Sequence, residues 1–109
     1  MKFIYIILSL FIAFTSLDAQ DAPMADCLIL EDENSIICKY THQRVEDEKT
    51  VLFQWIEPDG TVSRDRNMTI PPFHGSIYDY RYIKGRTAGV WTFKVIDQNQ
   101  TFSTNFTIE

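Results

Sequence analysis

Apolar and polar residues alternate with a period of two in several segments of this chain, and no segment after residue 20 repeats with the period of a helix. Such alternation is typical of a strand that buries one face. It is clearest around Trp55 and Trp91, each of which is the middle residue of an apolar face. The expected strands, separated by turn-forming residues, are 27–30, 35–40, 49–56, 61–70, 76–83, 89–96 and 101–108.

Seven short strands at this spacing predict an all-β fold built as a two-sheet antiparallel sandwich. The three segments with the clearest alternation, 49–56, 89–96 and 101–108, carry most of the aromatic core. The last two segments are joined by four polar residues, which predicts a hairpin. We expect Trp55 and Trp91 to lie together at the centre of the core.

A pattern in the second half of the chain resembles a known group of proteins. The run Phe53-x-Trp-x-x-Pro-x-Gly60, followed by Gly-x-Trp-x-Phe-x-Val95, is similar to small immunoglobulin-like modules exported by Gram-negative bacteria. The resemblance covers about residues 50–108 and implies an immunoglobulin-like sandwich. In antibody domains a disulfide joins the second and sixth strands, whereas both cysteines here precede residue 40, so only the architecture carries over.

The N-terminus is typical of an export signal, which we place at residues 1–19. Lys2 precedes an apolar run at 3–14, and Ala19 supplies the small residue of a cleavage site. The run is shorter than the roughly 20 apolar residues of a membrane-spanning helix, so no stable membrane insertion is expected. The mature chain, residues 20–109, is then a single domain in the periplasm or outside the cell.

The two cysteines, Cys27 and Cys38, flank the polar turn 31–34 and are expected to form a disulfide across an early hairpin. Two separate buried thiols are the alternative. Such a disulfide stabilises a small domain by about 3 kcal/mol. Two cysteines alone do not make a structural zinc site, and His42 and His74 lie in separate polar stretches, so neither a metal nor a cofactor is predicted.

The net charge of −5 is unevenly distributed. Residues 21–59 contain ten acidic and three basic residues, and the residues from 60 onward contain four acidic and six basic ones. An acidic exported chain is not expected to bind nucleic acid, which needs a basic surface. The charge either keeps the surface solvated or leaves a basic patch around Arg81, Lys84 and Arg86 for an acidic partner.

Three of the four asparagines lie in N-x-S/T glycosylation motifs. Asn67 and Asn99 follow an acid, Asp65 and Asp97, by two positions, which resembles the extended acceptor of bacterial periplasmic oligosaccharyltransferases. We predict glycans at Asn99 first and Asn67 second, and none at Asn105, which is expected in a strand. Asp97 is expected to be an exposed turn carboxylate. Chance occurrence of the motifs is the alternative.

The segment 76–83 contains the candidate binding residues. Tyr78, Tyr80 and Tyr82 share one face of the expected strand. The sequence favours the interpretation that these tyrosines face the core. If they face outward instead, they form an exposed surface together with Arg81 and Arg86, because Tyr and Arg are enriched at binding hot spots.

No nucleophile elbow, phosphate-binding loop or metal-ligand spacing occurs in the sequence, so a non-enzymatic protein is expected. We expect a periplasmic interaction module with a protein partner, for instance an accessory subunit of a cell-envelope assembly. The alternative is a secreted inhibitor of a protease or lysozyme, for which the loop 71–75 would enter an active site. A small hydrolase would need titratable residues clustered in one pocket.

Overall fold

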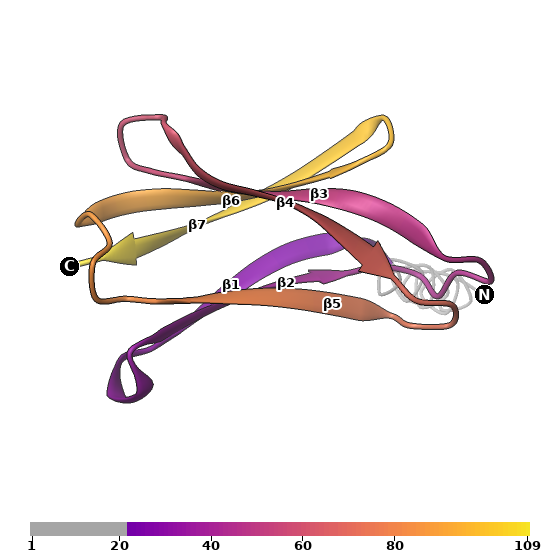
Figure 1. The fold of residues 1–109 in the computed structure, drawn as a ribbon, viewed down its shortest axis with the longest axis horizontal. Coiled ribbons are helices and arrows are strands. Elements are labelled where there is room, and N and C mark those ends of the chain that lie inside the picture. The colour runs from indigo at the N-terminus through magenta and orange to yellow at the C-terminus, as the bar shows by residue number, and fades with distance from the viewer. Residues whose placement is uncertain (1–21) are drawn as a thin grey trace, which may run out of the picture.

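The structure is a computed structural model that describes residues 22–109; the predicted signal peptide, 1–19, lies outside the described residues. Within residues 22–109 the fold consists of seven strands and one short 3₁₀ helix (Figure 1). In chain order they are β1 (Met24–Leu30), η2 (Glu31–Glu33), β2 (Ser35–Thr41), β3 (Lys49–Ile56), β4 (Val62–Ile70), β5 (Ser76–Tyr82), β6 (Gly89–Asp97) and β7 (Gln100–Ile108).

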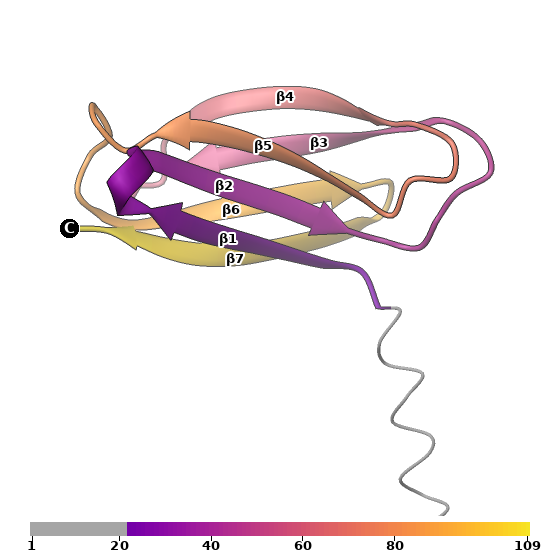
Figure 2. The same cartoon turned by 90° about the horizontal axis from the view of Figure 1, so that it is seen from below.

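The strands form two antiparallel sheets packed face to face, with the orders β1-β2-β5 and β4-β3-β6-β7. The predicted sandwich is thus confirmed. The fourth strand pairs with the third, whereas in constant-type immunoglobulin domains it joins the other sheet. β1 packs along β7 at one side of the sandwich, and β4 lies near β5 at the other (Figure 2).

The period-two pattern located every strand. The range 49–56 is the same in the structure, and the other strands differ from the expected ranges by one to three residues at their ends. The turn expected at 31–34 is a 3₁₀ turn that Asn34 ends in the left-handed region, with φ of 54°. Asn tolerates this conformation better than most residues. The resulting hairpin tip projects from the sandwich (Figure 1).

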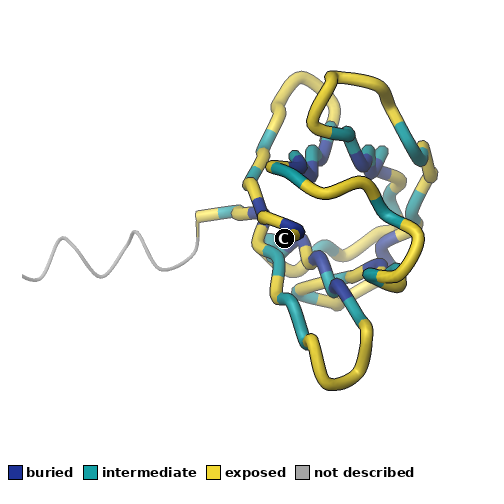
Figure 3. Tube along the Cα trace, turned by 90° about the vertical axis from the view of Figure 1, so that its left-hand side faces the viewer, coloured by how far each residue is buried: buried dark blue, intermediate teal, exposed yellow. Residues whose placement is uncertain are grey.

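The core lies between the sheets (Figure 3), and its largest fully buried side chains are aromatic. Trp55 and Trp91 are both essentially inaccessible to solvent, and both pack against Phe106, with ring centroids 5.8 and 6.0 Å away. Phe93 packs edge-on against Trp55 at 5.5 Å. The prediction that the two tryptophans share the central core is confirmed.

The predicted disulfide is also present. Cys27 and Cys38 are direct cross-strand partners in β1 and β2, with Cα atoms 4.1 Å apart. The disulfide therefore lies within one sheet. Cys38 is fully buried, on the face of that sheet that points into the core. Because side chains alternate along a strand, an inward Cys38 fixes which residues of β2 face the core.

The tyrosines of β5 face solvent, so the interpretation that they belong to the core is wrong. Tyr78, Tyr80 and Tyr82 are 63%, 53% and 58% exposed. The register of β5 against β2 places Asp79 opposite the inward Cys38, so the inward positions of β5 are the alternate ones. The sequence thus predicted correctly that the three tyrosines share one face of β5, but it assigned that face to the core and not to the solvent.

Truncating a central tryptophan tests the core. Trp91→Ala removes a buried ring from its contact with Phe106, and we expect it to lower the free energy of unfolding by about 3–5 kcal/mol. Tyr78→Ala is the matched control, because it truncates an exposed aromatic and should cost less than about 1 kcal/mol. Urea denaturation followed by circular dichroism measures both. Equal losses in the two variants would contradict the assigned faces.

Candidate functional site

The three-stranded sheet has one surface that no other element within residues 22–109 covers. Its residues are paired across the strands, with Ile37 between Leu28 and Tyr80, and Lys39 beside Tyr78. Leu28 is 57% exposed, which is similar to the exposed fractions of the three tyrosines. We call this surface the outer face, and it consists of Leu28, Ile37, Lys39, Tyr78, Tyr80 and Tyr82.

The opposite face of β5 carries a buried carboxylate. Asp79 accepts a hydrogen bond from the Trp55 indole Nε1 at 3.1 Å and from its neighbour's amide, Tyr80 N, at 3.0 Å. It also forms ion pairs with Arg66 at 2.8 Å and Arg64 at 3.3 Å. Both arginines come from β4, in the other sheet. These contacts compensate the cost of burying the charge.

Arg81, the one arginine of β5, also faces inward beside this carboxylate. The Arg81 guanidinium lies 5.5 Å from the centre of the Trp55 ring and donates a hydrogen bond to Ser63 Oγ at 3.0 Å. Ser63 is the extra residue of a β-bulge, because the register of β3 against β4 shifts between Trp55 and Ile56. Such a bulge redirects a side chain, here towards the Arg81 guanidinium. Burial, and then repulsion from Arg86 and Arg64, lower the pKa of Arg81 despite the nearby Asp79 and Glu57.

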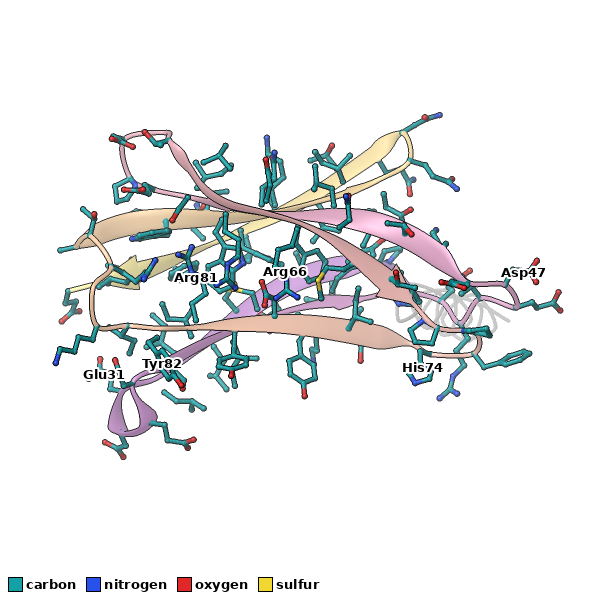
Figure 4. All side chains as sticks on the ribbon, in the orientation of Figure 1. Glu31, Asp47, Arg66, His74, Arg81 and Tyr82 are labelled. Atoms are coloured by element: carbon teal, nitrogen blue, oxygen red, sulfur yellow. A yellow bond between two sulfur atoms is a disulfide. The ribbon has the colours of Figure 1, made fainter. Side chains whose placement is uncertain are left out.

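These side chains line a cleft of about 290 Å³ at the side of the sandwich where β4 and β5 approach each other. Arg66 and Arg81 extend into the space between these two strands (Figure 4). We call it the arginine cleft, and its lining is Arg64, Arg66, Asp79, Tyr80, Arg81, Tyr82 and Arg86.

Two arginines of the cleft remain without a carboxylate partner among residues 22–109. All the ion pairs at this cleft involve Asp79 with Arg64 or Arg66. The Nε atoms of Arg81 and Arg86 are buried and have no hydrogen-bond acceptor in the described part of the chain. Unsatisfied buried donors are uncommon in native proteins and call for an explanation.

The structure brings most of the predicted binding residues together. Tyr80, Tyr82, Arg81 and Arg86 all line the arginine cleft, whereas Tyr78 lies on the outer face away from it. The sequence pattern did not predict the contribution of β4, which supplies Arg64 and Arg66, or the role of Asp79. One signal was available: Arg64 and Arg66 occupy alternate positions of the segment 61–70, where the strands around Trp55 and Trp91 have apolar residues.

Asp97 corrects a second expectation. It was expected to be an exposed turn carboxylate, but it is only 6% exposed. Tyr40 Oη donates a hydrogen bond of 2.8 Å to its Oδ2, and Lys49 Nζ lies 2.9 Å from its Oδ1. The two-residue turn that follows consists of Gln98, in the left-handed region with φ of 57°, and the exposed Asn99. The hairpin was predicted correctly, and its first residue belongs to the core.

The other acceptor asparagines are also accessible. Asn67 is exposed on β4, and the acid that precedes it, Asp65, is exposed as well. Asn105 is exposed on β7, where its side-chain oxygen accepts a hydrogen bond of 3.0 Å from Thr92 Oγ1. Exposure alone therefore does not separate the three sites.

The loop 71–75 connects β4 and β5 at the end of the sandwich where Asp47 and His74 lie (Figure 4). Phe73 is 64% exposed and has a left-handed backbone, with φ of 67°. Its amide donates a 2.6 Å hydrogen bond to Val45 O, and Arg44 donates one of 3.2 Å to Phe73 O. The neighbouring loop thus holds an exposed aromatic ring in a conformation that such a residue rarely adopts.

Among residues 22–109, no three His, Cys, Asp or Glu side chains are grouped so that they could hold a metal ion. Within the same range, none of the helices has the length and apolar character needed to cross a membrane. No protein-family model matches the sequence, and no curated protein shows significant similarity to it. The chemistry of the outer face and the arginine cleft therefore carries the functional argument.

The Tyr40–Asp97 contact predicts a dependence of stability on alkaline pH. Burial, together with the bond to Asp97 and its charge, raises the pKa of Tyr40 well above the ordinary value of 10.0. The unfolded chain loses this proton near the ordinary value, whereas the folded chain keeps it. Stability is therefore fully present below pH 10 and falls above it, by up to about 1.4 kcal/mol per pH unit.

Urea unfolding between pH 9 and 11 measures this dependence. Tyr40→Phe should unfold more easily at pH 7 but show a flatter decline, since it has no phenol to ionise. His42 and Lys49, the other titratable groups around Tyr40, remain in the variant. Tyr78→Phe is the matched control and should keep the wild-type slope. The same slope in Tyr40→Phe would contradict the assignment.

Proposed function

We propose that this chain is a non-catalytic, exported interaction module that binds a protein partner through the outer face of its β1-β2-β5 sheet. A periplasmic accessory subunit of a cell-envelope assembly fits this role. The observation that carries the proposal is the exposure of Tyr78, Tyr80 and Tyr82 on a surface that no other described element covers.

The composition of the outer face supports a protein partner. It combines three tyrosines with Leu28 and Ile37, while Lys39 adds a positive charge opposite the exposed Asp26 of β1. Tyrosine gives a large contact area with two side-chain torsions to fix, which lowers the entropic cost of binding. Contiguous exposed apolar surface on a small soluble domain is typical of interaction sites.

Three further features support the export part of the proposal. The disulfide between Cys27 and Cys38 is of the kind that persists in oxidising compartments. The sequence has a signal-peptide pattern at 1–19, and its second half resembles exported immunoglobulin-like modules of Gram-negative bacteria.

The geometry of the loop 71–75 favours one other candidate function, secreted inhibition of a protease or lysozyme. Phe73 projects from a loop that is tethered to residues 44 and 45 by hydrogen bonds. A rigid loop with one exposed aromatic residue is a form suited to entering an active site. The larger aromatic surface on β5 makes the interaction module the better-supported function.

Capture from the native envelope with single variants tests the proposal. Tyr78→Ser should reduce partner capture at least about tenfold, because removing an aromatic hot-spot residue costs on the order of 2 kcal/mol. Val90→Ser is the matched control, since Val90 is an exposed apolar residue of β6 in the other sheet. Phe73→Ser tests the inhibitor function. Loss of capture by Phe73→Ser but not by Tyr78→Ser would overturn the proposal.

Peptide mapping of protein from the native host tests the proposed glycans at Asn67 and Asn99. A transferase that reads the acid two positions earlier finds Asp65 exposed but Asp97 buried in the folded domain. We therefore expect Asn67 to be occupied more fully than Asn99 if modification follows folding. Thr69→Ala should abolish only the glycan at Asn67. A glycan at Asn105 would indicate a plain acceptor instead.

A further inference from the structure

The arginine cleft has more positive charge than the domain itself neutralises. Asp79 is its buried carboxylate and is already paired with Arg64 and Arg66. Arg81 and Arg86 share the same cleft without an ion pair among residues 22–109. The lining holds four guanidinium groups and one carboxylate, and Glu57, which is near Arg81, forms no ion pair with it among residues 22–109. Repulsion among the guanidinium groups costs free energy, and an added anion would remove part of that cost.

The arginines of the cleft carry the type of donor group that binds oxyanions. A guanidinium presents its N–H groups as a planar fork that matches a carboxylate, phosphate or sulfate. Arg81 uses one terminal nitrogen on Ser63, and its Nε is left buried without an acceptor, as is that of Arg86. A bound oxyanion would supply acceptors to both.

A ligand at this cleft has to be recognised by side chains. The backbone groups in the middle of β5 that face its free edge are already hydrogen-bonded within the domain. The carbonyl of Tyr80 accepts a hydrogen bond from Arg64 at 3.5 Å, and its amide donates to Asp79 at 3.0 Å. An added strand would need these same backbone groups. Inward-pointing charges of this kind protect sheet edges from pairing with another chain.

The charge of the whole protein selects among anions. A net charge of −5 opposes a long polyanion, whereas a short acidic segment can reach a local positive site. The acidic residues Glu31 and Asp47 lie towards opposite ends of the molecule, with Arg66 and Arg81 between them (Figure 4). The cleft is thus a positive region flanked by negative ones.

The cleft is also continuous with the outer face, because Tyr80 and Tyr82 belong to both. Their rings are 6.2 Å apart in an edge-to-face arrangement on β5, at the border between the two surfaces. A partner seated on the outer face can therefore extend a side chain around the edge of β5 into the cleft.

We propose that the arginine cleft binds carboxylate side chains of an acidic segment of the protein partner, with Arg81 and Arg86 as the groups that contact them. The inference rests on the proposed function, since it assigns a second contact to the same partner. It predicts that partner recognition combines an aromatic contact on the outer face with a charged contact in the cleft.

Titration of the ¹⁵N-labelled mature protein with acetylated hexaglutamate, followed by NMR, tests the cleft directly. We expect shifts of the Arg81 and Arg86 Nε–H signals and of the Trp55 indole N–H, which is bonded to Asp79. Hexaglutamine should leave them unchanged. Inorganic sulfate at matched ionic strength is the second probe. If sulfate saturates the site at lower concentration than the peptide, the assignment to carboxylates is wrong.

Charge-matched variants then separate a specific site from general electrostatics. Arg86→Gln should weaken hexaglutamate binding at least about tenfold, the loss expected for a charge-assisted contact. Lys94→Gln removes the same charge from β6, in the other sheet, and should change affinity less than about twofold. Equal effects of the two variants would overturn the proposal. Arg86→Lys keeps the charge without the fork and should recover only part of the affinity.

Arg81 needs a different readout, because its contact with Trp55 makes a folding defect a plausible result of substitution. For this residue the Nε–H shift in the wild-type protein is the measurement, and an unchanged signal at saturating peptide would contradict its role.

Partner capture distinguishes failure of this inference from failure of the proposed function. If Tyr78→Ser abolishes capture and Arg86→Gln does not, the cleft inference is wrong and the interaction module stands. If hexaglutamate binds the cleft as described but Tyr78→Ser leaves capture unchanged, the proposed use of the outer face is wrong.

Discussion

Asp79 joins the two sheets on the side where their strands pack least. β1 packs along β7 at the opposite side, whereas β4 and β5 make few direct contacts. There the Asp79 carboxylate from β5 contacts three residues of the four-stranded sheet. Arg64 and Arg66 come from its edge strand β4, and the Trp55 indole comes from its central strand β3. A buried charge with these partners is stable only in one orientation of β5. That orientation exposes the tyrosines and turns Arg81 inward.

The sequence predicted what depends on local pattern. The faces of the strands around Trp55 and Trp91 followed from alternation, and the pairing of Cys27 with Cys38 followed from a polar turn between two apolar runs. β5 escaped this reasoning because both of its faces alternate equally well, one with tyrosines and the other with Asp79 and Arg81. Periodicity gives two faces and does not say which is inside.

The information that decides the direction of β5 lies on other strands. Arg64 and Arg66 are near Asp79 only after β4 and β5 meet across the sandwich, so no spacing along the chain indicates it. Asp97 shows the same limit. The turn residues around it predicted an exposed hairpin. In the structure Asp97 is buried by contacts with Tyr40, from the other sheet, and with Lys49, from the neighbouring strand β3. Polar contacts between distant segments set both outcomes.

The two buried carboxylates differ in what surrounds them. Asp97 has partners and neighbours that serve only the fold, with Tyr40 and Lys49 both directed at it. Asp79 satisfies Arg64 and Arg66 and leaves Arg81 and Arg86 without an anion beside the exposed Tyr80. Natural proteins tolerate such local departures from optimal stability mainly at functional sites. The unneutralised arginines and the uncovered tyrosines occur at one edge, on either side of β5, and this coincidence is the physical reason why we propose that edge as the binding surface.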